Sequence, residues 1–267
     1  MGEGAKLRGE ALLDALERGE VRVATPDGDG GWTVHAWIKR AILELFRESD
    51  IAGMGLETEW SGSGAAPFRD KSTLGVRRFS EADGVRLVPG GSAVRRGAHL
   101  GRGVVCMPPM YVNVGAFVGE GTMIDSHALI GSCAQVGSGV HVSAAAQIGG
   151  VLEPPTARPV IVEDGAFVGG NVGLYEGVRV GREAVIAAGV VLSATTPVFD
   201  LVEERTLRGT RERPLTIPPR SVVVPGTRPS RGEWAEREGL QQACGLLVKR
   251  RDAGTDAATA LEGALRC

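Results

Sequence analysis

Residues 112–142 read VNVGAF VGEGTM IDSHAL IGSCAQ VGSGVH V, which divides into hexads that each begin with Val or Ile. The same six-residue spacing continues in both directions along the chain. The apolar positions are Val94, Leu100, Cys106, Val112, Val118, Ile124, Ile130, Val136, Val142 and Ile148, and then, after a break, Val162, Val168, Leu174, Val180, Ile186 and Leu192. A fixed short period sustained over this length indicates a repeat architecture.

Two further positions of the hexad support one fold. The residue after the apolar one is often Gly, and the residue four places after it is generally small, as at Ala98, Ala116, Ala128 and Ala146. This pattern is the hexapeptide repeat of a left-handed parallel β-helix, in which short strands run around a triangular prism with three hexads per coil. Its narrow interior admits aliphatic or small side chains, and we expect the glycines at tight corners where the backbone leaves ordinary φ/ψ space.

The flanking segments predict three regions in this mostly β chain. Residues 1–85 form a small N-terminal α/β domain, 86–228 the prism with excursions near 151–160 and 195–216, and 229–267 a C-terminal extension with a strand and a short helix. Within the first region, 9–19 and 33–49 have helical spacing, with Thr33 as the expected cap of the second helix. Residues 21–34 predict a strand followed by a Gly-rich turn.

Bulk composition narrows the functional classes. A net charge of −2 favours neither nucleic acid nor an anionic membrane as a partner. The charged N-terminus is unlike a signal peptide, and no uncharged apolar run approaches the roughly 20 residues of a membrane span. The four cysteines have neither paired metal-ligand spacing nor a disulfide framework. We expect a soluble cytoplasmic protein with no metal and no tightly bound cofactor.

The quoted stretch contains residues that suggest a Cys-His or metal site, but the repeat argues against both. His127 and Cys133 are six residues apart, so they occupy equivalent places on successive sides of the prism and face directions about 120° apart. Cys133 is therefore expected to be a packed thiol. His99, His127 and His141 occupy different hexad positions, which does not favour a zinc site within one chain.

Of the polar residues in the quoted stretch, Asp125 is the best candidate for a catalytic residue. It directly follows the core residue Ile124, at a place usually taken by Gly, where strand alternation points the side chain outward. An exposed carboxylate on such a face often serves only to keep a protein soluble. Whether Asp125 is catalytic must therefore be judged from other motifs in the chain.

Several motifs resemble the tetrahydrodipicolinate N-succinyltransferases, a family within the hexapeptide-repeat acyltransferases. They are EGTMIDSHALIGSCAQVGSGVHVS (120–143), IGGVLEP (148–154), GEVRVATPDGDGGWTVHAWIKRAILELFR (19–47), GVRLVPGGSAVRRGA (84–98), MPPMYVNVGAFV (107–118) and CGLLVKRRDAGT (244–255). The resemblance covers nearly the whole chain. It implies transfer of a succinyl group from succinyl-CoA to the amine of L-2-amino-6-oxopimelate, ring-opened tetrahydrodipicolinate, in lysine and diaminopimelate biosynthesis. It also implies a homotrimer with active sites in the clefts between neighbouring prisms.

The resemblance also assigns site residues. The family aspartate and arginine that contact the amino-dicarboxylate match Asp125 and Arg86, and a forked guanidinium suits a carboxylate. Arg95 and Arg96 are alternatives to Arg86 whose more ordinary role is charged surface. For CoA, the resemblance points to small residues on the outer C-terminal coils, namely Gly169, Ala187, Ala188 and Gly189, with Lys249, Arg250 and Arg251 available for its phosphates.

The chain departs from the family at one catalytic position. Many members have ARSEVVEG, whose first glutamate is assigned a catalytic role, whereas this chain reads GNVGLYEG with Gly173 at that place. Glu176 matches only the second glutamate and is our candidate substitute. Because Asp125 and Glu176 belong to different sides of the prism, a shared site would need two subunits.

Three hypotheses follow. The first is the succinyltransferase, with Asp125 as general base and substrate ligand and backbone N–H groups of the corners as oxyanion donors. The second is an acetyl-CoA-dependent N-acyltransferase on a related amino acid. The third is a non-catalytic or metal-binding β-helix protein.

Overall fold

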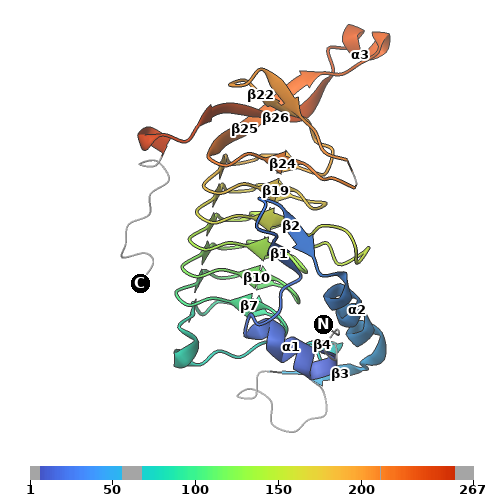
Figure 1. Cartoon of the computed structure of the whole chain (residues 1–267), viewed down its shortest axis with the longest axis vertical. Coiled ribbons are helices and arrows are strands. Elements are labelled where there is room, and N and C mark those ends of the chain that lie inside the picture. Colours follow the sequence, from blue (N-terminus) through green and yellow to red (C-terminus); the bar gives the residue numbers. More distant parts are fainter. Residues whose placement is uncertain (1–6, 56–67, 211, 256–267) are drawn as a thin grey trace.

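The computed structural model describes residues 7–55, 68–210 and 212–255, and its centre is the predicted left-handed parallel β-helix. Sixteen two-residue strands carry the hexads, and each ends on one of the predicted apolar positions (Figure 1). The strands are β6 (Ala93–Val94), β7 (His99–Leu100), β8 (Val105–Cys106), β9 (Tyr111–Val112), β10 (Phe117–Val118), β11 (Met123–Ile124), β12 (Leu129–Ile130), β13 (Gln135–Val136), β14 (His141–Val142), β15 (Gln147–Ile148), β16 (Ile161–Val162), β17 (Phe167–Val168), β18 (Gly173–Leu174), β19 (Arg179–Val180), β20 (Val185–Ile186) and β21 (Val191–Leu192).

Every third strand stacks in a parallel sheet, which gives the prism three faces. The first face contains β5 (Arg86–Leu87), β8, β11, β14, β17, β20 and part of β25 (Ser221–Pro229). The second contains β6, β9, β12, β15, β18 and β21, and the third contains β7, β10, β13, β16, β19 and β24 (Thr216–Ile217). We call the bend from first to second face the first corner, from second to third the second corner, and from third to first the third corner.

Side-chain size explains why these hexads form the interior. All sixteen apolar positions are at most 4% exposed, and they pack together as one column. The small residues four places on are buried beside them, for example Ala98, Thr122 and Ala134. Burial at about 25 cal/mol per Å² of apolar surface makes this column the main stabilising element of the prism.

The glycines have two roles, not the single role expected from the sequence. Positive φ occurs three residues after the apolar position, and this place holds not only glycines but also His127 (φ 62°) and Cys133 (φ 67°). The glycines that directly follow the apolar position are instead required by close approach of the next coil. A methyl group on Gly131 would lie 2.2 Å from the backbone nitrogen of Gly150. These glycines set the coil spacing.

The N-terminal region combines α1 (Gly9–Glu17), the hairpin β1 (Ala24–Pro26) and β2 (Trp32–Val34), α2 (Ala36–Glu48), and a second hairpin of β3 (Ile51–Met54) and β4 (Phe68–Lys71). In Figure 1 its helices flank the lower coils and β1–β2 lies in front of the middle ones. A short 3₁₀ helix, η1 (Glu81–Asp83), precedes the first coil.

The expected cap at Thr33 is wrong. Thr33 pairs with Thr25 in the β1–β2 hairpin, and α2 begins only after His35, which makes no side-chain capping bond. The sequence predicts one strand and a turn here, whereas the structure has a second strand, β2, after the turn. Cross-strand pairing holds Thr33 extended and away from the first turn of α2.

Arg22 fastens this region to the third face. Its guanidinium carbon lies 3.5 Å from the centre of the Phe117 ring and 5.7 Å from that of Trp32, and its Nε donates to Gln135 at 3.2 Å. Burial lowers the pKa of Arg22 to about 10. Trp32 also donates from Nε1 to Glu163 at 2.9 Å.

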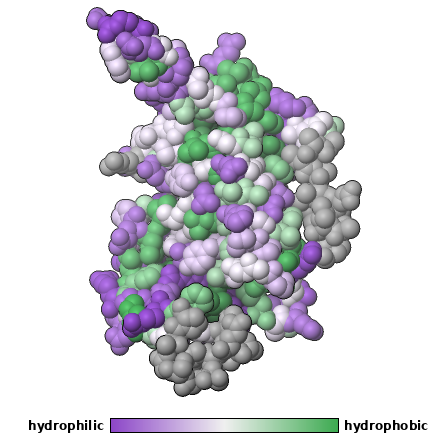
Figure 2. Space-filling view, turned by 180° about the vertical axis from the view of Figure 1, so that it is seen from behind, coloured by the Kyte–Doolittle hydropathy of each residue, from purple (hydrophilic) through white to green (hydrophobic). Residues whose placement is uncertain are grey.

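The chain leaves the prism twice and then closes its end. Residues 149–160 bulge between β15 and β16, and the second departure contains β22 (Val198–Asp200) and β23 (Arg205–Leu207). β25 joins the first face and then forms a hairpin with β26 (Gln241–Arg250), whose tip carries α3 (Glu233–Arg237). Figure 2 shows this mostly hydrophilic tip standing clear of the body.

The predicted C-terminal strand is confirmed as β26, whereas the short helix expected after it falls mainly on residues outside the described ranges. Among the described helices, none combines the length and apolar character needed to cross a membrane.

Candidate active site

Asp125 lies at the first corner with its carboxylate held by local backbone. Its N–H donates to the Val142 carbonyl of the next coil at 2.9 Å, and its carbonyl accepts from Ala128 at 3.2 Å. The Ser126 N–H donates to Oδ1 at 2.7 Å. The side chain is half-buried, so a carboxylate of fixed orientation faces outward at the bend.

Asp125 belongs to a row of equivalent positions on successive coils. Met107, Asp125, Ser143, Gly169 and Ala187 each donate their N–H to the core residue of the next coil. Asp125 is the one charged member of this row, and above it the row holds only small residues.

The residues proposed for CoA therefore lie on the same corner as Asp125, in higher coils. Ala188 and Gly189 are exposed there and Ala187 is half-buried. Glycine is required at position 169 by packing alone, because a methyl group there would lie 2.6 Å from the Ala188 nitrogen. The small residues leave an open strip along this corner above the carboxylate.

Arg86 lies on the first face as well. β5 pairs with β8, which pairs with β11, so Arg86 is two coils below Asp125. In this register Arg86 lies below Met123, at the start of the strand, whereas Asp125 follows the end of it. Arg86 is exposed and points outward, as does Asp125. The alternatives Arg95 and Arg96 instead form ion pairs with the N-terminal region, Arg95 with Asp70 and Arg96 with Asp14 and Glu17.

Glu176 is not close to Asp125 within one chain. It lies at the second corner with φ 53°, and its Oε2 accepts from the Ala194 N–H at 3.2 Å. Asp125 follows a strand of the first face and Glu176 follows a strand of the second, as the hexad count predicts.

The space above Gly173 is filled by Tyr175. A methyl group on Gly173 would lie 2.6 Å from Cε2 and 3.0 Å from the hydroxyl oxygen of Tyr175. Tyr175 is not among the site residues predicted from the sequence. The available signal was an aromatic residue directly after the apolar Leu174, where the hexad usually has Gly.

The basic triplet proposed for the CoA phosphates already has partners in the fold. Lys249 lies 2.9 Å from Asp252, Arg250 donates to Ser221 at 2.7 Å, and Arg251 donates to the Gly165 carbonyl at 3.1 Å. Lys249 is exposed and its ion pair with Asp252 is solvent-accessible, so breaking that pair to bind a phosphate would cost little free energy.

The cysteine and histidines of the quoted stretch do not converge. Cys133 is buried at the second corner, under the N-terminal region and near Lys39, whereas His127 is exposed at the first corner. Lys39 is itself fully buried and donates from Nζ to the Ala157 carbonyl at 2.7 Å. In the described part of the chain, no cluster of three or more His, Cys, Asp or Glu side chains could hold a metal ion.

Burial makes the Cys133 thiol unreactive. It raises the pKa of Cys133 to about 12, and that of Cys106 also to about 12. At pH 8 only about one such thiol in 10⁴ is ionised. We expect iodoacetamide at pH 8 to leave both residues unmodified in native protein and to alkylate both after unfolding in guanidinium, as measured by peptide mass spectrometry. Native labelling of Cys133 at the rate of a free thiol would contradict its burial.

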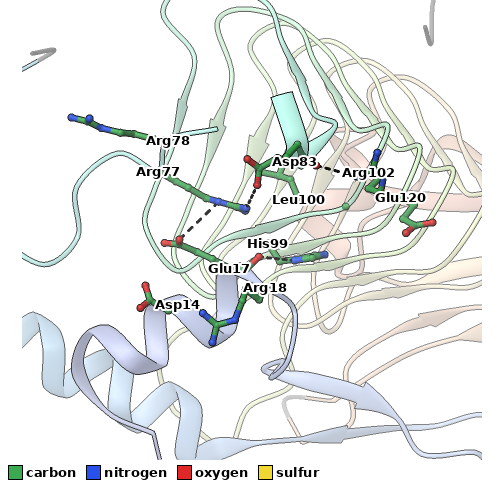
Figure 3. A pocket seen from close by; sticks show the side chains of 12 residues that line it. Asp14, Glu17, Arg18, Arg77, Arg78, Asp83, His99, Leu100, Arg102 and Glu120 are labelled. Carbon is green, nitrogen blue, oxygen red and sulfur yellow. Dashed lines mark hydrogen bonds and ion pairs between the residues drawn. The ribbon is translucent and has the colours of Figure 1, made fainter. Parts of the chain in front are cut away.

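A cavity lies at the third corner of the lowest coils. Its volume is about 450 Å³, and none of the predicted site residues lines it. Figure 3 shows its charged walls, among them Glu17 of α1, Arg77, Arg102 and Glu120. His99 donates from Nδ1 to the Glu17 carbonyl at 2.9 Å, and burial lowers the pKa of His99.

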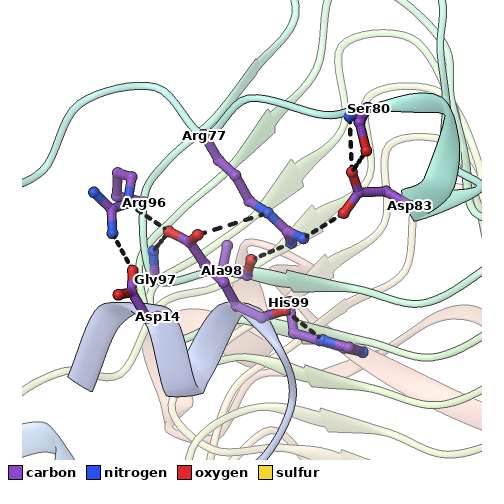
Figure 4. A network of polar contacts seen from close by, with 9 residues as sticks. Asp14, Arg77, Ser80, Asp83, Arg96, Gly97, Ala98 and His99 are labelled. Carbon is purple, nitrogen blue, oxygen red and sulfur yellow. Dashed lines mark hydrogen bonds and ion pairs between the residues drawn. The ribbon is translucent and has the colours of Figure 1, made fainter. Parts of the chain in front are cut away.

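The charges of this cavity form a network that fastens α1 to the prism (Figure 4). Glu17 Oε1 accepts from Arg96 Nε at 2.7 Å and from the Gly97 N–H at 2.8 Å. Arg77 lies 4.0 Å from the other carboxylate oxygen of Glu17 and donates to the Ala98 carbonyl at 2.7 Å. Because these groups satisfy one another, we interpret the network as a clamp between domains.

Glu17→Gln is expected to lower the free energy of unfolding by about 2 kcal/mol, because it removes the charged acceptor of the Arg96 and Gly97 hydrogen bonds. It also leaves the nearly buried Arg77 with Asp83, at 3.5 Å, as its carboxylate partner. Chemical denaturation measures the loss. Glu48→Gln, an exposed carboxylate on α2, is the matched control and should leave stability unchanged. Equal effects of the two variants would contradict a clamp.

Comparison with known proteins agrees with this architecture. A family model for the tetrahydrodipicolinate N-succinyltransferase N-terminal domain matches residues 9–47, and one for the hexapeptide repeat of succinyl-transferase matches residues 159–194. Among solved structures, a putative 2,3,4,5-tetrahydropyridine-2-carboxylate N-succinyltransferase from Campylobacter jejuni has a TM-score of 0.53. It is 18% identical and covers 89% of this chain and 61% of its own, which supports the fold.

Curated relatives are similar over almost the whole chain. The 2,3,4,5-tetrahydropyridine-2,6-dicarboxylate N-succinyltransferases of Rhodopseudomonas palustris (strain BisA53) and Idiomarina loihiensis are 42% and 43% identical. Both alignments cover 96% of this chain, with 88% and 87% of the respective relative. The enzyme of that name from Xylella fastidiosa (strain 9a5c) is 41% identical, over 96% of this chain and 86% of its own. The chain therefore belongs to the tetrahydropyridine-dicarboxylate N-succinyltransferase family.

Proposed function

We propose that this protein transfers a succinyl group from succinyl-CoA to the amine of L-2-amino-6-oxopimelate, in lysine and diaminopimelate biosynthesis. The observation that carries this proposal is the Asp125 carboxylate, fixed at a prism corner below an open strip of small residues, in a chain 42% identical to enzymes of that name. A carboxylate suits the ammonium of the acceptor, and the strip suits an extended pantetheine.

In the reaction we propose, the acceptor amine attacks the thioester carbonyl carbon. The N–C bond forms, the C–S bond breaks, and the sulfur leaves as the thiol of CoA after protonation. The amine attacks in its neutral form; Asp125 orients it and accepts a proton from the nitrogen as the N–C bond forms, and corner N–H groups donate to the developing oxyanion. Arg86 would bind a carboxylate of the acceptor. Because no covalent acyl-enzyme is needed, the buried Cys133 has no part in this scheme.

We further propose a homotrimer with sites between subunits. Asp125 and Glu176 lie at different corners, so a cleft between two prisms could receive one from each. The CoA strip of Gly169, Ala187, Ala188 and Gly189, with Lys249 for a phosphate, would lie in the same cleft. We expect this enzyme in the cytoplasm, in keeping with the free thiols at Cys106, Cys133 and Cys244.

The test is thiol release, followed with a thiol reagent, from succinyl-CoA with L-2-aminopimelate as a stable acceptor. Acetyl-CoA runs in parallel, and a reaction without acceptor corrects for the protein's own thiols. Acceptor-dependent release that prefers succinyl-CoA supports the proposal. Preference for acetyl-CoA would replace it with the second hypothesis, and no turnover by folded protein would leave only a shared ancestry with the enzymes.

A further inference from the structure

Tyr175 lies flat against the second face of the prism. Its ring covers two glycines, Gly173 in its own coil and Gly149 in the coil below. A methyl group on Gly149 would lie 2.7 Å from Cδ1 of Tyr175, and one on Gly173 would lie 2.6 Å from Cε2. The absence of side chains at both positions is what allows the ring to lie on the sheet.

The ring is directed along the strand toward the first corner. Tyr175 follows Leu174 at the second-corner end of β18, and its ring extends back over Gly173. The hydroxyl is its most distant atom, 3.0 Å from where a methyl group on Gly173 would be. The phenol therefore carries its oxygen toward the corner that holds the Asp125 row.

The hydroxyl is available to a ligand. Tyr175 is 38% exposed, and no hydrogen bond joins its hydroxyl to another residue in the described ranges. Chance exposure of a tyrosine does not require two glycines beneath it. Gly149 is also required by the approach of the next coil, since a methyl group there would lie 2.9 Å from the Leu174 carbonyl oxygen. A methyl group on Gly173 would meet the Tyr175 side chain first, so this glycine makes room for the ring.

The strand residues around Gly173 on this face are uncharged. Gln147 pairs with Gly173 in the strand register directly below it, and its Nε2 donates to the Ala145 carbonyl at 3.3 Å. The row that precedes the apolar positions on this face contains no charged residue; its members are Ala93, Tyr111, Leu129, Gln147, Gly173 and Val191. A neutral phenol in such a row is suited to donate a hydrogen bond to a carbonyl or carboxylate oxygen.

We infer that Tyr175 is a substrate-contacting residue, whose hydroxyl donates to an oxygen of a bound substrate. This inference rests on the proposed function and deepens it. The oxygen belongs either to the thioester carbonyl, where the bond strengthens as negative charge develops, or to a carboxylate of the amino-dicarboxylate. On this inference, the glycine at position 173 makes room for the Tyr175 ring, whose hydroxyl contacts the substrate.

Tyr175→Phe tests the inference, because it keeps the ring on its glycine bed and removes only the oxygen. We expect kcat/KM to fall about 10- to 100-fold, the range of one hydrogen bond to a charged group, with unchanged melting temperature. A fall in kcat assigns the contact to the thioester carbonyl, and a rise in KM for L-2-aminopimelate assigns it to the acceptor carboxylate. Wild-type kinetics in Tyr175→Phe would overturn the inference while leaving the proposed function standing.

The chain provides a matched control, since Tyr111 is its other tyrosine and lies on the same face. The hydroxyl of Tyr111 is 3.5 Å from Asn113 Oδ1, within its own coil. Tyr111→Phe should retain activity within about twofold, so an equal loss in both variants would also overturn the inference.

A second measurement does not depend on turnover. Tyr111→Phe protein labelled with 3-fluorotyrosine has one fluorinated residue, Tyr175. We expect its ¹⁹F resonance to shift on addition of either succinyl-CoA or L-2-aminopimelate alone, and the ligand that shifts it identifies the source of the oxygen. If wild-type protein shows no turnover, a ligand-induced shift still supports contact at Tyr175, and no shift with either ligand overturns it.

Discussion

Asp125→Asn is expected to lower kcat/KM for succinyl transfer by about 10²- to 10⁴-fold, the usual contribution of a positioned general base. Asparagine has nearly the same shape and can still accept the Ser126 N–H, so the corner should keep its geometry. What is lost is the group that accepts the proton from the attacking nitrogen. Steady-state thiol release measures the effect, with thermal unfolding of both proteins as the check on folding.

The control removes a carboxylate from another corner. Glu120 is exposed at the third corner of the preceding coil, and Glu120→Gln changes net charge by the same amount. Its activity should stay within about twofold of wild type. If Asp125→Asn behaves like Glu120→Gln, Asp125 is only a solubilising residue and the base lies elsewhere.

Gly131→Ala is expected to lower the free energy of unfolding by about 3 kcal/mol or more. The new methyl group would lie 2.2 Å from the Gly150 nitrogen and 2.6 Å from its Cα. Both atoms belong to backbone of the next coil, which cannot move aside like a flexible side chain. The coils must separate locally, and chemical denaturation or loss of soluble protein reports it.

Gly139→Ala is the matched comparison. Gly139 has φ +63° and open space where its methyl group would be, so the substitution costs only the left-handed backbone strain, about 1 kcal/mol. If the glycines were needed only for the backbone conformation of the corners, as expected from the sequence, Gly139→Ala would lose more stability than Gly131→Ala. A larger loss at Gly139 than at Gly131 would reinstate that expectation.

The interior of the prism could be predicted from the sequence because its requirements are local and repeated. Each coil places the same hexad position against the same column, so size and polarity at that position are decided by the repeat. Ile124, Leu174 and the other apolar positions are all buried as predicted. The same count placed Asp125 and Glu176 on different faces.

The features that were missed depend on segments distant in the chain. Cys133 could be predicted to pack, but not that Lys39 of α2 would be buried nearby and donate to the Ala157 carbonyl. Thr33 has the identity of a helix cap, and only its pairing with Thr25 rules the cap out. Tyr175 over Gly149 involves a coil 26 residues earlier and a side-chain direction that hexad spacing does not specify.

Strand β26, which crosses the C-terminal end of the prism, limits the addition of further coils there. A bare terminal coil would present unpaired N–H and C=O groups, a template on which a second molecule could polymerise end to end. β26 lies across that end, with Gly245 in contact range of Leu192, Val198 and Val223. Its long antiparallel pairing with β25 uses the edge groups of the first face within the same chain. A second prism therefore cannot continue all three sheets from this end, and the repeat can stop without becoming the start of a filament.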